Sequence, residues 1–331
     1  MIRSHRLVLA LAAALLLAAC GDPLVPHVPL TSLTNIQLPR DTGLPSFDLL
    51  TLDSRVGRLY ISHSSNDAVD IVDLKTNTVL ESVTGLRKVH AIALTSDPNI
   101  VFTSDPGDGM VGVVDVAQRK VLKFIDVGPQ PDAIGYDPVD DLVVAVLAST
   151  NTVKLIDPHT YLVVATMALP GSPELMDVDL VQGRVFLAIN DKDEVIIIDV
   201  KSRQITTTFK GCDIAIPTGV AFDPDQQRLY VASRPGNNRE LNIIDTLIGK
   251  CLGVVDIGFG TDQIAFNKHN HHVYAANGGS KNLSVIDTVS LKPLGVVGTG
   301  PIAKSVAVDP TTDRVYALIG RAGIIGVYHD P

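Results

Sequence analysis

The chain has 331 residues, 46% of them hydrophobic, and it contains no Trp. This length is enough to bury a large core, in one domain if the chain is all-β. The formal net charge is −9, which argues against nucleic acid as a partner, because phosphate backbones are bound by basic surfaces.

The first nineteen residues have the pattern of a secretory signal peptide. Arg3 and Arg6 precede an apolar run over residues 7–17, and this run is too short to span a bilayer. We therefore exclude residues 1–19 from the folded domain. Their removal takes away two positive charges and brings the net charge to −11.

The apolar run ends in the sequence LAACG, with Cys20 as its fourth residue. This resembles the lipobox of bacterial lipoproteins, and the resemblance implies that Cys20 is lipidated and anchors the chain to a membrane. Asp22 does not directly follow Cys20, which by the rule of that family favours the outer membrane. Residues 20–32 contain three Pro and are expected to form a stiff tether. The alternative is an ordinary cleaved signal in which Cys20 has no role.

Residues 33–331 consist of a repeat of about 42 residues. Residues 262–297 show one unit, in which β-branched and aromatic segments at 264–266, 272–276, 283–287 and 293–297 alternate with Asn, Gly and Asp turns. Such segments are typical of strands, and four strands in about forty residues are the size of a propeller blade. The Asp that ends the third strand recurs at Asp73, Asp115, Asp157, Asp199, Asp245 and Asp287.

Seven units can be counted, but the last one ends at Pro331 without a fourth strand. Residues 33–38 precede the first unit and have no other partner. Pairing them beside residues 324–327 would close the ring and leave no open sheet edge. The sequence therefore predicts an all-β fold: a single seven-bladed β-propeller over residues 33–331, with four-stranded blades and the last blade closed by the N-terminal strand.

Several segments resemble the YVTN-type, YncE-like bacterial propellers. They are LYVAS at 229–233, VYAAN at 273–277, VID at 285–287 and the Asp-Pro turns at 137, 223 and 309. The resemblance implies the propeller fold but leaves the function open, since that family is functionally mixed. The missing Trp and Gly-His pairs argue against WD-type repeats.

The residue that precedes each innermost strand is polar in every unit. The seven residues are Asp48, His90, Asp132, Glu174, Thr218, Asp262 and Lys304. In a closed propeller they ring the mouth of the central channel, and we expect them to bind a ligand. Loops between the second and third strands open on the same face and bring further polar residues, which are His63, Asp105, Asn190, Asp191, Arg234, Asn237 and Asn277.

Four of these seven residues are carboxylates: Asp48, Asp132, Glu174 and Asp262. Converging carboxylates repel one another and either gain protons or take up a cation. An oxygen-rich site suits Ca²⁺ or Mg²⁺, so a metal site at the mouth is one expectation. The alternative is a wet channel whose polar lining is only solvated.

Other motifs carry less weight. No C-x-x-C-H is present, so we expect no haem c. His269, His271 and His272 are expected in an exposed turn on the opposite face. Residues 298–305 only approach a phosphate-binding loop, since Ala303 replaces its second Gly. An oxidising compartment would permit a disulfide between Cys212 and Cys251. Their repeat positions, however, suggest opposite ends of outer strands in adjacent blades, which disfavours pairing.

Three functions remain open at this point. The first is a non-enzymatic binding module of the cell envelope, which uses the mouth for a protein, peptide or glycan. The second is a metal-dependent enzyme, similar to propeller lactonases or lyases, with His90 as general base and Glu174, Asp132 and Asp262 as ligands. The third is a redox partner, by resemblance to the propeller domains of haem-d nitrite reductases and amine dehydrogenases.

Overall fold

The structure is a computed structural model that describes residues 30–41, 44–234 and 240–331. The predicted signal peptide, Cys20, the tether up to residue 29, Asn237 and Arg239 lie outside these ranges. Within them no helix is long and apolar enough to cross a membrane.

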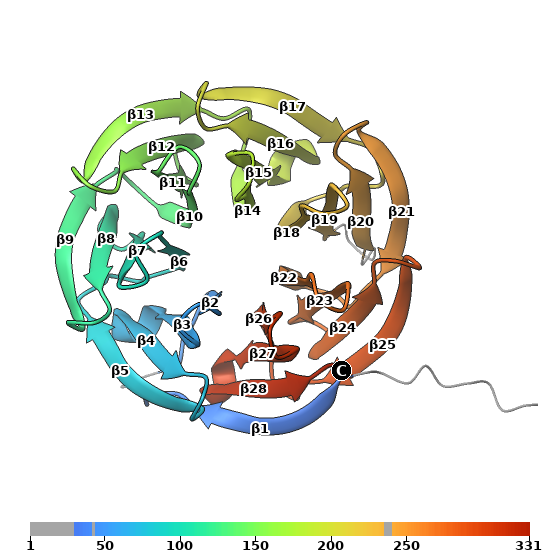
Figure 1. Ribbon diagram of the computed structural model, residues 1–331, viewed down its shortest axis with the longest axis horizontal. Coiled ribbons are helices and arrows are strands. Elements are labelled where there is room, and N and C mark those ends of the chain that lie inside the picture. The colour runs from blue at the N-terminus through green and yellow to red at the C-terminus, as the bar shows by residue number, and fades with distance from the viewer. Residues whose placement is uncertain (1–29, 42–43, 235–239) are drawn as a thin grey trace, which may run out of the picture.

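Seven four-stranded antiparallel sheets are arranged in a ring around a central channel (Figure 1). This confirms the predicted seven-bladed all-β propeller. Blades 1 to 3 contain β2 (Leu50–Asp53), β3 (Arg58–His63), β4 (Ala68–Asp73) and β5 (Thr78–Thr84); β6 (Ala91–Leu94), β7 (Ile100–Asp105), β8 (Met110–Asp115) and β9 (Lys120–Asp126); and β10 (Pro131–Asp137), β11 (Leu142–Leu147), β12 (Thr152–Asp157) and β13 (Leu162–Ala168).

Blades 4 to 6 follow the same order from the channel outwards. They contain β14 (Pro173–Asp179), β15 (Arg184–Ile189), β16 (Glu194–Asp199) and β17 (Gln204–Lys210); β18 (Pro217–Asp223), β19 (Arg228–Ser233), β20 (Glu240–Asp245) and β21 (Lys250–Asp256); and β22 (Thr261–Asn267), β23 (His272–Asn277), β24 (Asn282–Asp287) and β25 (Lys292–Gly298). One-turn 3₁₀ helices η1 (Ser64–Asn66), η2 (Asn190–Lys192) and η3 (Gly320–Ala322) follow the second strand in blades 1, 4 and 7.

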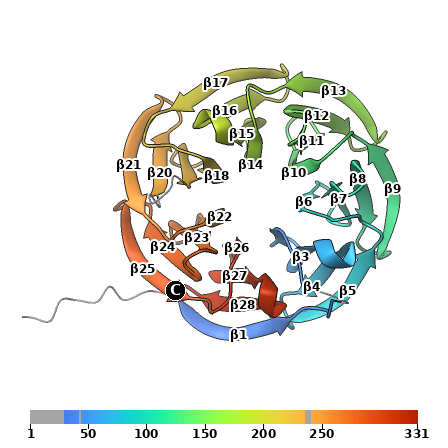
Figure 2. The same ribbon diagram turned by 180° about the vertical axis from the view of Figure 1, so that it is seen from behind.

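The last blade combines both ends of the chain. It consists of β26 (Ser305–Asp309), β27 (Arg314–Ile319) and β28 (Ile324–His329), with β1 (Thr31–Gln37) as its outer strand. Thr31 pairs with His329 and Gln37 with Ile324, as the missing fourth strand predicts. The view from behind shows β1 bridging the rim between β25 and β5 (Figure 2).

The blades pack through apolar side chains, and the second and third strands have runs of consecutive buried residues, as in β11 and β16. The second strands carry a buried aromatic layer, which includes Tyr60, Phe102, Phe186, Tyr230, Tyr274 and Tyr316. Neighbouring blades share these clusters, as when Phe186 of β15 meets Phe222 of β18 with ring centroids 4.5 Å apart. Burial of these aromatic side chains, together with the more numerous aliphatic ones, holds neighbouring blades together.

The two faces of the ring differ in their connections. The mouth face carries the residues before each first strand and the loops between second and third strands. The turn face carries the turns after first and third strands, where Asp side chains accept backbone N–H groups; for example, Asp137 Oδ1 accepts from Val139 at 2.9 Å and Asp223 Oδ1 from Asp225 at 2.9 Å. These bonds close the turns, so the repeated Asp residues are structural. Because Thr31 lies beside His329, the chain enters the propeller at the turn face.

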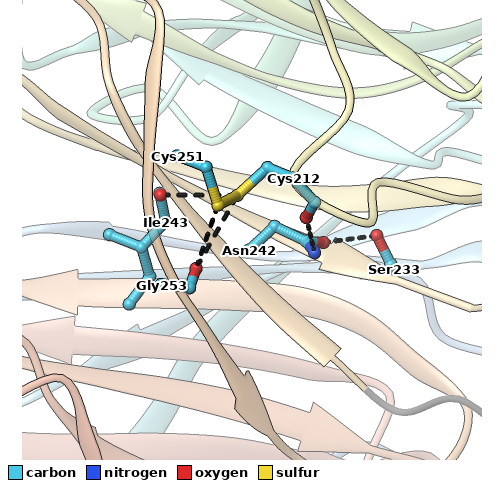
Figure 3. Close-up of a disulfide and its surroundings, with 6 residues drawn as sticks. All are labelled: Cys212, Ser233, Asn242, Ile243, Cys251 and Gly253. Atoms are coloured by element: carbon cyan, nitrogen blue, oxygen red, sulfur yellow. Dashed lines mark hydrogen bonds between the residues drawn. A yellow bond between two sulfur atoms is a disulfide. The ribbon is translucent and has the colours of Figure 1, made fainter.

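The two Cys of the propeller form a disulfide, which corrects the expectation that their positions disfavour pairing (Figure 3). Cys212 does not lie in an outer strand but in the connection after β17, and Cys251 lies in β21. The connection packs against β20, where Asn242 donates to the Cys212 carbonyl at 2.6 Å. The connection between β17 and β18 therefore brings the Cα atoms to 5.1 Å, a distance that the regular repeat spacing does not reveal.

Candidate functional site

The channel mouth brings six of the seven predicted polar residues into one cavity of about 160 Å³. The cavity is lined by Asp48, His90, Asp132, Glu174, Asp262 and Lys304, together with the apolar residues Leu49 and Leu175. Each polar residue precedes or begins the first strand of a different blade. The seventh, Thr218, is fully buried and its hydroxyl donates to the carbonyls of Thr261 (3.1 Å) and Ala232 (3.4 Å).

Most charges at the mouth are paired with one another. Lys304 Nζ lies 2.7 Å from Asp48 Oδ1 and 3.9 Å from Asp262 Oδ2. His90 Nδ1 lies 2.6 Å from Asp132 Oδ1, while its Nε2 lies 3.6 Å from Asp48 Oδ2.

Arg234 adds a second cation from the loop after β19. Its guanidinium bonds the Asp262 carboxylate and the Thr261 carbonyl. The backbone N–H of Arg234 is held by the carbonyls of Ala215 and Ile216, which belong to the connection fixed by the disulfide.

The expected Ca²⁺ or Mg²⁺ site stays a prediction, and this pairing of charges counts against it. Among the described residues, no group of three or more His, Cys, Asp or Glu side chains is placed to hold a metal ion. Asp48 is neutralised by Lys304, Asp132 by His90, and Asp262 by Arg234. Repulsion between the carboxylates is relieved by cations of the protein itself.

Glu174 is the exception among the four carboxylates. Within the described ranges no cation lies at salt-bridge distance from it, and desolvation raises its pKa to about 6, against the opposing influence of Arg234. A half-buried carboxyl group of this kind favours a proton or a hydrogen-bond donor brought by a ligand.

His90 is biased towards its protonated form. Burial alone lowers its pKa, but the bond to Asp132 and the charge of Asp48 outweigh it, and the net pKa is raised. The raised pKa increases the protonated fraction of His90 at a given pH, and the protonated imidazole suits a negative group rather than a general base.

His63 lies apart from the mouth cavity. Its side chain is fully buried, with Nδ1 2.7 Å from Asp70 Oδ2 and Nε2 2.8 Å from Asp41 Oδ1. Burial lowers its pKa, but the two carboxylates outweigh burial and the net pKa is raised. These contacts connect β3 to β4 and to the segment after β1, so His63 has structural contacts rather than an exposed surface.

Asp105, Asn277 and Asp191, which were also predicted near the mouth, do not line the mouth cavity. Asp105 is buried, and desolvation raises its pKa to about 8. Asn277 is buried and donates to Asn282 at 2.8 Å, whereas Asp191 accepts the backbone N–H of Ser172 at 2.6 Å. On the turn face, His269 and His272 pair separately with Asp313 and Asp330.

Below the mouth the channel becomes apolar. A second cavity of about 140 Å³ is lined mainly by Leu, Ile, Ala and Met side chains of the innermost strands. Leu49 and Leu175 line both cavities, so the two are neighbours along the channel. Neither residue was among the predicted site residues, although each directly follows a residue of the polar column in the sequence.

The chain is similar to a protein family and to solved structures. The family model of the cytochrome D1 heme domain matches residues 180–323, which is less than half of the chain. The solved structure of Kuenenia stuttgartiensis hydrazine synthase has a TM-score of 0.79 at 18% identity and covers 93% of this chain and 98% of that chain. At this identity the likeness shows the fold alone. No curated protein sequence matches.

The match to a haem domain contradicts the expectation of no haem c. That expectation rested on the absence of C-x-x-C-H, which concerns only covalent attachment; haem is also held through axial ligands alone. His90 offers such a donor, since a carboxylate on the other ring nitrogen is typical of metal-binding His. The mouth cavity of about 160 Å³ is, however, below the roughly 300–1,000 Å³ usual for such sites. The mouth as described has a donor for haem but not the room, and the chain is a seven-bladed β-propeller with partial similarity to a haem domain.

Proposed function

We propose that this protein is a non-enzymatic binding module of the bacterial cell envelope, which holds a small polar ligand at its channel mouth. The observation that carries the proposal is the convergence of six polar side chains from six blades on one cavity. Apart from Glu174, their charges are already paired, so the site is preorganised and loses little freedom when a ligand binds.

Glu174 identifies the chemistry of the ligand. It carries the carboxylate at the mouth that lacks a paired cation within the described ranges, while its neighbours Asp132 and Asp262 are bonded. A ligand that brings an ammonium group or hydroxyl donors to Glu174 would satisfy it. Short peptides and amino-sugar glycans of the envelope have these groups.

The proposal is tested by calorimetry on the soluble form that begins at residue 21. The panel contains short cationic peptides and amino-sugar oligosaccharides. We expect at least one to bind, and Glu174→Gln to weaken its binding about tenfold, as for a lost charged contact. Glu81→Gln is the control, because Glu81 lies on the outer strand β5. If no ligand binds, or if both variants bind like the wild type, the proposal fails.

A second candidate, a haem-binding redox protein, is supported by the match of residues 180–323 to the cytochrome D1 heme domain. Binding at the mouth would require the cavity to widen around His90. Titration with haemin would give a shifted Soret band that disappears in His90→Ala. An unchanged haemin spectrum in the presence of the protein would remove this candidate.

A further inference from the structure

A cavity of about 440 Å³ lies on the turn face, between blades 2 and 3. It is separate from the mouth and is not used by the proposed function. Its walls come from the turn after β6, the start of β7, the turn after β10 and the turn after β12. The residues that line it are Thr95, Ser96, Asp97, Ile100, Phe102, Tyr136, Pro138, Asp141, Pro158, His159 and Tyr161.

The same place between blades 4 and 5 is filled by an arginine of the chain. The guanidinium carbon of Arg184 lies 5.5 Å from the centroid of the Phe186 ring and 5.8 Å from that of Phe222. Its Nη2 donates to Asp179 at 2.7 Å and to Gln227 at 3.1 Å. A cation over two adjacent aromatic rings and beside a carboxylate is a stable arrangement.

Blade 2 keeps the aromatic rings but lacks the cation. In blade 2, Ile100 has the repeat position that Arg184 has in blade 4. Thr95 likewise has the repeat position of Asp179. Phe102 and Tyr136 occupy the repeat positions of Phe186 and Phe222. The cavity between blades 2 and 3 therefore corresponds to the position that the Arg184 guanidinium occupies between blades 4 and 5.

Thr95 cannot pair with a guanidinium as Asp179 does, but two other carboxylates lie at this cavity. Asp97 and Asp141 both line the cavity, and the Asp141 side chain is 47% exposed. Asp141 Oδ1 accepts from the Tyr136 hydroxyl at 2.7 Å, and its Oδ2 lies 2.7 Å from His159 Nε2. These contacts hold the carboxylate at the edge of the cavity and leave it accessible.

The outer wall is also aromatic. The Tyr161 ring centroid lies 6.3 Å from that of Phe102, with the ring planes tilted by 52°. Aromatic faces beside carboxylates recognise planar cations, and a guanidinium is better suited to such a site than a compact ammonium.

We propose that the cavity between blades 2 and 3 binds a guanidinium group supplied from outside the chain, in the place that Arg184 occupies within blade 4. The group would lie over the Phe102 and Tyr136 rings that line the cavity and pair with Asp97 and Asp141. An arginine side chain of a peptide and a small guanidine compound share this chemistry.

The test uses agmatine, a guanidinium on a short aliphatic chain, and follows its binding to the soluble propeller by calorimetry. We expect one site in the wild type. Ile100→Arg places a guanidinium of the chain in the cavity and is expected to weaken agmatine binding at least about tenfold. Asp97→Asn with Asp141→Asn should have a similar effect, and a peptide with one Arg should compete with agmatine.

Asp225→Asn is the matched control, because Asp225 has the position in the turn of blade 5 that Asp97 has in blade 2. The affinity of this variant for agmatine should stay within about twofold of the wild-type affinity. If Ile100→Arg does not fold, the double Asn variant decides, since both side chains lie at the surface. Absence of agmatine binding, or equal binding in the wild type and the cavity variants, would overturn the proposal.

Discussion

Single carboxylates in the channel wall have environments that their sequence position alone does not show. Asp177 lies on the innermost strand β14, and the structure supplies the partners that a half-buried carboxylate requires. Its Oδ2 accepts the backbone N–H of Phe222 in blade 5 at 2.8 Å, and its Oδ1 accepts that of Val178 at 2.8 Å. Asp177 thus connects blades 4 and 5.

This contact has a pH dependence. Desolvation raises the Asp177 pKa to about 6 from 3.8, so the folded state binds the proton more tightly than the unfolded chain. The resulting loss of stability is absent below about pH 4, grows between about pH 4 and 6 and then stays constant. We expect Asp177→Asn to keep an acceptor for Phe222 and to raise the free energy of unfolding above pH 6 by about 1–3 kcal/mol relative to its effect at pH 4. Urea unfolding at both pH values measures this, and an equal effect at both would contradict it.

At the scale of elements, two connections hold the ring together: the pairing of β1 with β28 and the disulfide next to blade 5. In β1, Ile36 is 2% exposed and packs in the core shared with β2 and β27, whereas Leu33 on the same strand is 50% exposed. The alternation of the strand thus assigns one side chain to closure of the ring and the other to solvent.

We expect Ile36→Ala to lower the free energy of unfolding by about 2–4 kcal/mol, because it leaves a cavity in the core that closes the ring. Leu33→Ala on the same strand should change it by less than about 1 kcal/mol. Urea unfolding of both variants compares them directly. Equal losses would show that closure does not depend on the buried side of β1.

The disulfide provides a second prediction at this scale. Replacing Cys212 and Cys251 by Ser should lower the free energy of unfolding by about 2–4 kcal/mol, since the bond restrains a loop in the unfolded chain. It should also loosen the connection whose carbonyls hold Arg234. Adding a reductant to the wild type should give the same loss, and adding it to the double variant should change nothing. If the reductant leaves the free energy of unfolding of the wild type unchanged, the disulfide does not have this stabilising role.

For the whole molecule, the position of the chain entry relates the propeller to a membrane. The described chain begins beside β28 at the turn face, opposite the mouth. We propose that Cys20 is lipidated and that the anchor leads to the turn face. The mouth would then point away from the bilayer and be open to ligands of the envelope.

This predicts that the full-length protein, expressed in a bacterium, sediments with membranes and that Cys20→Ala releases it into the soluble fraction after cleavage of the signal. Mass spectrometry of the mature N-terminus would show the added acyl chains. A wild type that is soluble and unmodified at Cys20 would contradict the anchor and leave the propeller itself unaffected.

Local periodicity was enough to predict the scaffold. The strand patterns, the Asp turns and the missing fourth strand of the last unit are short-range features that repeat about every 42 residues, and a blade can only bury its faces against its neighbours. The polar column at the mouth followed from the same register, since position in the repeat determines position in the ring.

Only the tertiary structure decided what that column does with its charges. Lys304 meets Asp48 across 256 residues, and His90 meets Asp132 in the next blade, so a group that resembled a metal site in the sequence became a set of ion pairs. The disulfide, the burial of Thr218 and the cavity beside Ile100 were likewise decided by side chains of different units. Contacts between blades depend on side-chain size and direction at the interface, which the repeat spacing of a single sequence does not specify.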